Sequence, residues 1–177
     1  DLGRNDVNDA GVRALAGSRT LTRLSGLKLA GNHAGDAGAA ALAGSALFRR
    51  MLARDGRVDL RANGIGPAGA AALAAALAEA TALALDKNYL GDRGAVAVVA
   101  AAAAAGLRRL RLSRNQITDA GAFALADALT RGLPALRSID LSGNRLTWRG
   151  ANAVRDAAFA RGVIPDVSGN APGSSTH

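Results

Sequence analysis

The sequence predicts an α/β solenoid, in which short parallel strands form one sheet and helices pack behind it. Three observations lead to this prediction. An asparagine recurs every 25 to 31 residues along the 177-residue chain. Alternating apolar residues stand just before each asparagine, and a glycine followed by an alanine-rich and leucine-rich segment stands after it. A self-similar unit of this length is typical of stacked repeat architectures.

The first element of each unit is a short strand with one buried face. Two apolar positions separated by one outward position are the period-two pattern of such a strand. The aliphatic residues three positions before the asparagines are Leu2, Leu29, Leu60, Leu85, Leu112, Leu141 and Val167. In the middle five units, the apolar residues five positions before are Leu27, Val58, Leu83, Leu110 and Ile139.

The next element is a turn that carries the asparagine, and a helix begins near the glycine six positions later. The glycines are Gly11, Gly38, Gly69, Gly94, Gly121 and Gly150, and the apolar spacing after each of them is helical. Two positions before the glycine stands Asp9, Asp36, Asp92 or Asp119 in four units, where a carboxylate suits a helix N-cap or a first turn. Pro67 takes this position in the third unit and suits a helix start, whereas nothing in the sequence explains Trp148 in the sixth.

The pattern Leu-x-Leu-x-x-Asn-x-Leu-x-x-x-Gly, with an Ala/Leu helix behind it, resembles the leucine-rich repeats of the ribonuclease-inhibitor type over residues 1–170. This resemblance implies a horseshoe-shaped solenoid with a parallel concave β-sheet and convex α-helices. It also implies that the asparagine side chains bond backbone groups of neighbouring turns and form an internal ladder. That ladder would consist of Asn5, Asn32, Asn63, Asn88, Asn115, Asn144 and Asn170.

The two ends of the chain differ from its middle. Residues 1–170 hold about six repeats and a rudimentary last strand, in which Pro165 takes an inward position. The chain begins inside a strand, without the polar cap that terminal repeats need, so we expect further repeats before Asp1. Residues 171–177 are polar, and we expect them to form a disordered tail.

The composition excludes several classes of function. Without cysteine and with only His33 and His177, the chain cannot form a disulfide framework, a thiolate or histidine-rich metal site, or a conventional histidine-dependent triad. Its longest uncharged apolar stretch, residues 94–107, is too short to span a bilayer. We therefore expect no enzyme activity, no cofactor, no metal and no membrane association.

The chain carries a formal net charge of +8, and 20 of its 22 basic residues are arginine. This balance favours an acidic partner. An excess of Arg, Ala and Gly with almost no Lys is also what a GC-rich coding sequence produces, so both explanations of the charge stay open.

Outward strand residues are the candidate binding residues, because they would line the concave surface. The candidates are Lys28, Arg57, Asp59, Arg61, Asp86, Arg109, Arg111, Ser113 and Asp140. Asp59 and Asp86 would lie on adjacent strands, but the neighbouring Arg57 and Arg61 favour cross-strand ion pairs over acid–base catalysis. The run Gly64-x-Gly66-x-x-Gly69 has the spacing of a dinucleotide fingerprint, yet here it is repeat turn chemistry. Phe123 and Phe159 fall on helix segments, where we expect them in the core.

These observations predict a non-catalytic module that binds or scaffolds another protein, an acidic one or a multi-subunit assembly, and no small-molecule substrate. Three alternatives remain: a structural subunit of a large ciliary or organellar assembly; a regulatory segment of an immune-receptor-like or Ran GTPase-activating-like protein; and RNA binding through Arg108, Arg109, Arg111 and Arg114. The concave strand positions lack the aromatic residues that nucleic-acid binding usually uses. The absence of cysteine and of a leader favours an intracellular, cytoplasmic setting, with a cilium or an organelle as alternatives.

Overall fold

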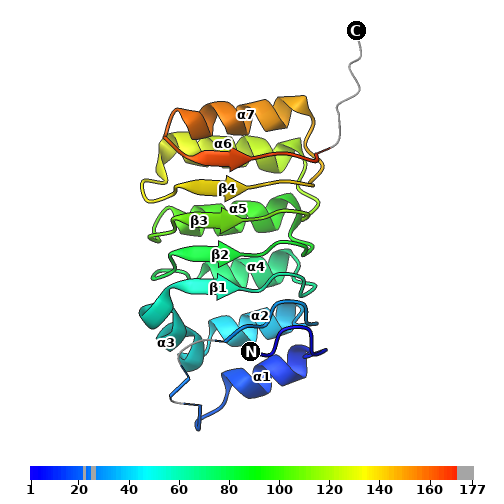
Figure 1. The fold of residues 1–177 in the computed structure, drawn as a ribbon, viewed down its shortest axis with the longest axis vertical. Coiled ribbons are helices and arrows are strands. Elements are labelled where there is room, and N and C mark those ends of the chain that lie inside the picture. Colours follow the sequence, from blue (N-terminus) through cyan, green and yellow to red (C-terminus); the bar gives the residue numbers. More distant parts are fainter. Residues whose placement is uncertain (22, 25–26, 171–177) are drawn as a thin grey trace.

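The computed structural model describes residues 1–21, 23–24 and 27–170, which contain seven helices and five short strands. In chain order the elements are α1 (Asp9–Ala16), α2 (Asp36–Ala43), α3 (Ala46–Asp55), β1 (Arg57–Asp59), α4 (Pro67–Ala74), β2 (Ala82–Ala84), α5 (Gly91–Ala102), β3 (Arg109–Arg111), α6 (Asp119–Gly132), β4 (Ser138–Asp140), α7 (Trp148–Phe159) and β5 (Ile164–Asp166). Figure 1 shows the strands stacked in one layer with helices behind them. The predicted disordered tail, residues 171–177, lies outside the described residues.

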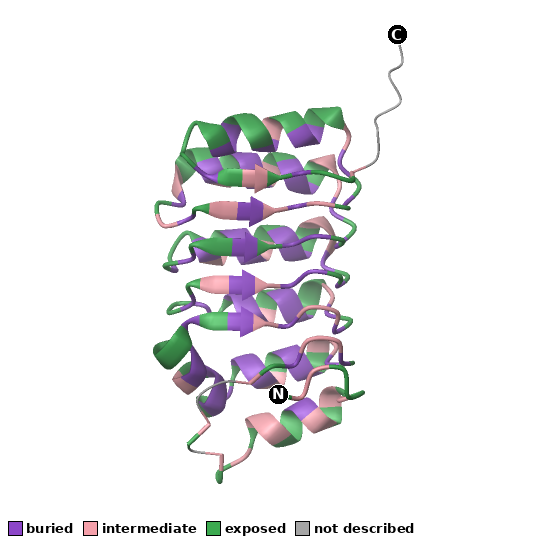
Figure 2. Ribbon diagram, in the orientation of Figure 1, coloured by how far each residue is buried: buried purple, intermediate pink, exposed green. Residues whose placement is uncertain are grey.

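The sheet is parallel and follows the order of the chain, β1-β2-β3-β4-β5. The central strand residues stand opposite one another in register, and they are Val58, Leu83, Leu110, Ile139 and Pro165. All except Pro165 are buried, and Pro165 is half-buried at the inward position that the sequence predicts (Figure 2). Parallel strands need crossover connections, and α4, α5, α6 and α7 provide them on the same side of the sheet. The other face of the sheet is therefore left exposed.

Within the described residues, the first two units lack the strands that the sequence predicts. Backbone hydrogen bonds do join these units, from Leu2 N–H to the Lys28 carbonyl at 2.9 Å and from Arg4 N–H to the Ala30 carbonyl at 3.0 Å. Between the second unit and the third, however, the one backbone hydrogen bond among the described residues runs from Gly31 N–H to the Arg61 carbonyl. Residues 27–30 therefore do not complete a ladder with β1, and the sheet begins at β1.

The second unit contains two helices where the sequence predicts one. After α2 ends, the Ser45 side chain accepts a hydrogen bond from Phe48 N–H at 3.0 Å and so caps a new helix, α3. Phe48 is fully buried and anchors α3 to the core. This added helix accounts for the longest spacing in the chain, the 31 residues from Asn32 to Asn63.

The recurrent asparagines join successive turns. Asn88 Oδ1 accepts a hydrogen bond from Asn63 N–H at 3.0 Å, and its Nδ2 donates to the Leu60 carbonyl at 3.0 Å. Equivalent contacts with the preceding unit are made by Asn32, Asn63, Asn115, Asn144 and Asn170. Asn5 is the exception, because it is exposed and its side chain donates only to the Gly3 carbonyl. The hydrogen bonds of the predicted ladder are thus present from Asn32 onward, where they satisfy backbone groups of the turns.

The aspartate of the first helical turn bonds to the following repeat instead of capping its own helix. Asp36 Oδ1 accepts hydrogen bonds from Gly66 N–H at 2.6 Å and Gly69 N–H at 2.9 Å. The sequence allows either an N-cap or a first-turn position for these aspartates, and the structure places them in the first turn. The N-caps of the four helices are other residues, Asn8, Gly35, Leu90 and Thr118. A Cβ on Gly69 would lie 2.6 Å from Asp36 Oδ1, so the recurrent glycine makes room for the aspartate.

The core runs unbroken between the sheet and the helices, but it does not include every aromatic residue of the helices. Phe123 and Phe159 are 47% and 67% exposed, so the expectation that they belong to the core is wrong. Alanine and aliphatic side chains fill the inward helix positions, such as Ala122 and Leu125 of α6. Because these helices pack closely on their neighbours, the larger rings are accommodated on the solvent side.

Candidate interaction surface on the exposed face of the sheet

Outward side chains form two aligned rows across the exposed face of the sheet, and this is where the predicted binding residues lie. The row at the start of the strands is Arg57, Ala82, Arg109, Ser138 and Ile164. The row at their ends is Asp59, Ala84, Arg111, Asp140 and Asp166. Arg61, Asp86, Ser113 and Ser142 follow two residues after the second row. Lys28 lies before β1, with its ammonium 3.7 Å from an Asp1 carboxylate oxygen.

Arg61 and Asp59 form a bidentate ion pair on this face. Arg61 Nε donates to Asp59 Oδ1 at 2.8 Å and Arg61 Nη2 donates to Asp59 Oδ2 at 2.7 Å. Burial raises the pKa of Asp59, but the hydrogen bonds from Arg61 and the positive charges of Arg61 and Arg111 outweigh it and hold this pKa below its usual value. The same pairing raises the pKa of Arg61. The pair is therefore charged at neutral pH.

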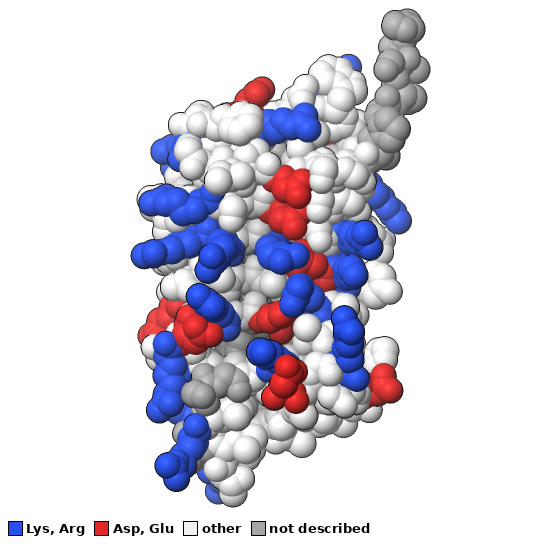
Figure 3. Space-filling view, viewed as in Figure 1, with Lys and Arg blue, Asp and Glu red and all other residues white. Residues whose placement is uncertain are grey.

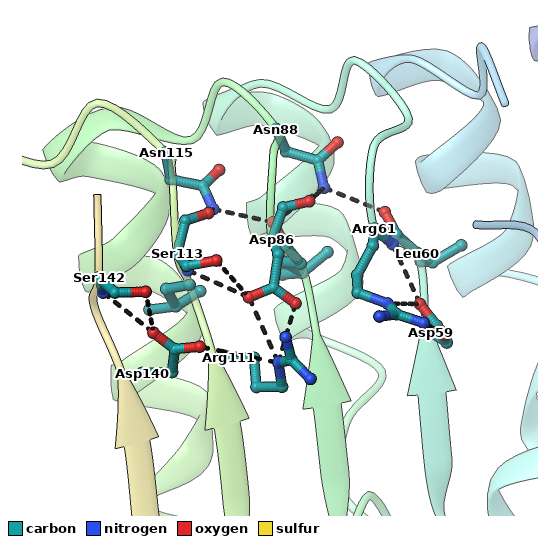
Figure 4. A network of polar contacts seen from close by, with 12 residues as sticks. Asp59, Leu60, Arg61, Asp86, Asn88, Arg111, Ser113, Asn115, Asp140 and Ser142 are labelled. Atoms are coloured by element: carbon teal, nitrogen blue, oxygen red, sulfur yellow. Dashed lines mark hydrogen bonds and ion pairs between the residues drawn. The ribbon is translucent and has the colours of Figure 1, made fainter. Parts of the chain in front are cut away.

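Arg111 connects two neighbouring repeats by reaching carboxylates on both sides (Figure 4). Its Nε lies 3.1 Å from Asp86 Oδ2 and 3.8 Å from Asp140 Oδ2. Ser113 adds a hydrogen bond from its hydroxyl to Asp86 Oδ1 at 2.7 Å, and the Ser142 hydroxyl donates to Asp140 Oδ1 at 2.7 Å. The network holds charged side chains in one geometry across β2, β3 and β4.

The structure corrects two expectations about these residues. Asp86 is only 3% exposed and Ser113 only 9%, and Asp86 is held by the Ser113 hydroxyl and by Arg111, so neither offers much surface to a partner. The cross-strand ion pairs come from Arg111, whereas Arg61 pairs within its own strand segment and Arg57 lies 3.6 Å from Asp55. Asp59 and Asp86 thus belong to two separate ion pairs, and each carboxylate already has a basic partner.

Two hollows mark this face. The larger, about 640 Å³, lies beside Asp86 and is lined by Arg61 and Arg111 together with Arg4 and Lys87, which sequence reasoning missed. The smaller, about 260 Å³, has its floor at β2 between the charged residues of β1 and β3. No described helix is long and apolar enough to cross a membrane, and no described cluster of three acidic or histidine side chains could hold a metal ion.

The missed basic residues share one position, directly before the ladder asparagine. Every residue there has a left-handed backbone, with φ between 53° and 73°. These residues are Arg4, Gly31, Ala62, Lys87, Arg114, Gly143 and Gly169. The fixed offset from the asparagine is a signal that could have identified this row of turn residues.

Comparison with known protein families finds leucine-rich repeats in this chain. One leucine-rich-repeat model matches residues 1–16, 57–74 and 107–126, and a second matches residues 135–156. The last three segments each contain a strand and run into the helix that follows it. No curated protein matches the chain. Leucine-rich-repeat domains generally mediate protein–protein interactions and are typically non-enzymatic. The chain is therefore built of leucine-rich repeats, folded as an open α/β solenoid.

Proposed function

We propose that this chain is a non-catalytic module that binds a partner protein through the exposed face of the sheet. The observation that carries the proposal is the ion-pair network on that face, in which Arg111 joins the carboxylates of Asp86 and Asp140. Side chains held in this way lose little conformational freedom when a partner docks, which lowers the entropic cost of binding. The alternation of one strand with one helix in most units also supports assignment to the ribonuclease-inhibitor type.

The charge pattern supports a partner with acidic groups. Figure 3 shows acidic side chains near the middle of this face, with Lys and Arg side chains between them and on both sides. Arg57 and Arg109 stand at the starts of their strands, while Lys87 and Arg114 stand in the turns beyond them. An acidic segment would be attracted to the basic edges more than to the middle, where carboxylates and arginines pair with one another, and this difference sets its position as well as its affinity.

Crosslinking mass spectrometry in native lysate tests which face is used. Lys28 and Lys87 are the only lysines, so a linker that joins carboxylates is needed. We expect partner crosslinks at Asp59, Asp140 and Asp166. Crosslinks confined to the helix side, at Glu79, Asp127 and Asp156, would contradict the proposal.

A matched pair of substitutions gives a second readout. Ala84→Arg places a long side chain on the exposed face of the sheet, and Ala100→Arg places the same side chain on the exposed side of α5. We expect Ala84→Arg to weaken partner capture by at least about tenfold, because an interface core tolerates such a clash poorly. Ala100→Arg should leave capture unchanged.

The helix side offers a second candidate, a structural subunit packed through its convex surface. A hollow of about 670 Å³ lies between α2, α3 and the region of α4, and it is lined mainly by alanine side chains together with Leu52. The additional helix α3, which lies at the edge of the stack below β1 in Figure 1, forms part of its wall. Glu79 also lines this hollow, so a partner crosslink at Glu79 together with loss of capture by Ala100→Arg would favour this second function.

A further inference from the structure

The smaller hollow on the sheet face has a positively charged rim and a small, uncharged floor. Ala82 stands in register between Arg57 on one side and Arg109 on the other. Neighbouring strands lie about 4.8 Å apart, so the backbones of the two arginines are roughly 10 Å apart across the alanine. Ala82 and Ala84 leave the space above β2 open, and the resulting hollow measures about 260 Å³. We name this hollow, lined by Arg57, Asp59, Ala82, Ala84, Arg109 and Arg111, the β2 notch.

The side chains that line the β2 notch carry an excess of positive charge, with three arginines and one carboxylate. Its one carboxylate, Asp59, is already bound through both oxygens by Arg61. Arg111 is engaged by Asp86 and Asp140, and Arg57 has a single, longer contact with Asp55 at 3.6 Å. Within the described part of the chain, Arg109 has no carboxylate within ion-pair distance. Arg57 and Arg109 are thus the side chains available to a ligand.

Two guanidinium groups on opposite sides of a small gap match a tetrahedral dianion. Each planar guanidinium can donate two parallel hydrogen bonds, and a phosphoryl group presents three acceptor oxygens that both arginines can share. A carboxylate has two oxygens in one plane and half the charge, so it can satisfy one arginine fully but not both. Because the hollow is small, a short side chain is enough to bring its phosphoryl group to the alanine floor.

We propose that the β2 notch binds the phosphate of a phosphoserine or phosphothreonine side chain presented by the partner protein. This inference rests on the proposed function, because it places the partner on the exposed face of the sheet. Arg57 and Arg109 bind the phosphate from its two sides, and Ala82 leaves room for it between them. Arg111, held between the carboxylates of Asp86 and Asp140, closes the end of the notch nearer to the turns.

The charge distribution argues against a nucleic acid as the source of the phosphate. An RNA strand that continued from the notch toward β5 would pass the carboxylates of Asp140 and Asp166. Among the described residues, Asp166 has no basic partner to offset its repulsion of a phosphate. No aromatic side chain stands in the two outward rows of β1 to β5 to stack with bases. An isolated phosphate on a protein side chain avoids both problems.

Binding of synthetic peptides tests the proposal directly. The probes are two degenerate peptide pools with a fixed central phosphoserine or phosphothreonine, the same pools without phosphate, and inorganic phosphate. Fluorescence anisotropy measures binding of the peptides, and inorganic phosphate is measured as a competitor, all at constant ionic strength. We expect the phosphorylated pools to bind at least about tenfold more tightly than the unphosphorylated ones, as charge-assisted contacts predict. Binding should strengthen as the pH rises through about 6, where the phosphate becomes a dianion.

Four variants locate the site. Arg57→Gln and Arg109→Gln should each weaken binding of the phosphorylated pools by about tenfold or more, because each removes one guanidinium. Ala82→Leu fills the notch without changing any charge, and it should weaken binding of the phosphorylated pools as strongly. Arg93→Gln removes the same charge from the exposed side of α5 and should have no effect beyond a small change in salt dependence. Circular dichroism of each variant checks that it is folded.

Several outcomes would overturn the inference while leaving the proposed function intact. In one such outcome, Ala84→Arg abolishes partner capture, whereas neither phosphatase treatment of the partner nor Arg109→Gln changes it. Another is affinity for the phosphopeptide pools no greater than for inorganic phosphate, which would reduce the notch to a site for small anions. Tighter binding of single-stranded RNA, lost on substitution of Arg108 and Arg109, would assign the surface to nucleic acid instead. Partner crosslinks confined to the helix side would contradict both proposals.

Discussion

Asp92 in the first turn of α5 accepts two hydrogen bonds from Thr118, the residue that caps the next helix, α6. Both the Thr118 backbone N–H and its hydroxyl lie 2.7 Å from Asp92 carboxylate oxygens. Asp119 makes the same pair of contacts with Thr147 at the start of α7. A carboxylate from one repeat therefore neutralises part of the positive end of the following helix. These contacts link successive helices just as the asparagines link successive turns.

Two units lack this aspartate, and the relationship explains one of them, the unit of α7. Pro67 takes its place at the start of α4, and the helix of the next unit, α5, has Leu90 at its N-cap with no side-chain hydrogen bond to it. Trp148 takes its place in α7, and no helix follows α7 among residues 160–170. The aspartate is useful only where a following helix begins, which the sequence of a single unit does not reveal.

Replacing Asp92 should destabilise the stack. In Asp92→Ala the Thr118 N–H loses its carboxylate acceptor, and we expect the free energy of unfolding to fall by about 1–3 kcal/mol. Urea unfolding followed by circular dichroism measures this change. Asp127→Ala, which removes an exposed carboxylate paired with Arg131 on α6, should cost no more than about 0.5 kcal/mol. Equal losses in the two variants would show that the contact between repeats contributes little.

The glycine in the first turn of α6 should resist substitution, although alanine has the better helix propensity. A Cβ on Gly121 would lie 2.5 Å from Asp92 Oδ1 and 2.7 Å from Ile117 Cγ2. We expect Gly121→Ala to lower the melting temperature by several degrees, because overpacking typically costs about 1–3 kcal/mol. Gly106→Ala is the control, since a Cβ there meets nothing within 4 Å, and it should leave the melting temperature unchanged or raise it slightly. Similar effects of both substitutions would refute the steric argument.

The turn before the ladder asparagine stores backbone strain wherever its residue has a side chain. Ala62 has φ 53°, a conformation that costs an L-residue about 1–2 kcal/mol and costs glycine almost nothing. Relief of this strain is partly offset because glycine makes the unfolded chain more flexible. Ala62→Gly should therefore be neutral or raise the free energy of unfolding by up to about 1 kcal/mol. Ala84→Gly, in the strand β2, should lower it by about 0.5–1 kcal/mol. A clear loss of stability in Ala62→Gly would contradict this account of the turn.

Asp59 should make the stability of the fold sensitive to acid. Burial raises its pKa, but hydrogen bonds from Arg61 and the charges of Arg61 and Arg111 lower it further, so its folded-state pKa lies below the unfolded value of about 3.9. The unfolded chain then binds more protons in acid, and the stabilisation is complete above pH 4 and lost as the pH falls through the folded-state pKa. Melting temperatures of Asp59→Asn between pH 7 and pH 2.5 should fall less steeply than those of the natural sequence. Asp127→Asn serves as the control for loss of one charge. If the melting temperatures of Asp59→Asn and the natural sequence fall equally steeply with pH, Asp59 does not contribute to the acid sensitivity.

Much of the fold follows from regular spacing in the sequence. The inward positions of β1 to β5, the turn asparagines and the helix starts near the recurrent glycines all lie where the period places them. The insertion of α3 has a weaker signal, the long interval between Asn32 and Asn63 and the capping residue Ser45. Nothing in the sequence signals that the described residues of the first two units form no strand, because a strand depends on hydrogen bonds to its neighbour as well as on its own residues.

The candidate site, like the fold, was predictable from the sequence only in part. The period alone places Arg57, Asp59, Arg109, Arg111 and Asp140 on the exposed face of the sheet, because side chains alternate between the two faces of a strand. Only the tertiary structure shows that Asp86 is covered, that Arg111 joins neighbouring repeats, and that Ala82 leaves a gap between two arginines. The repeat period therefore determines which residues share a face, whereas their exposure and pairing depend on the lengths of side chains that stacking brings together from different repeats.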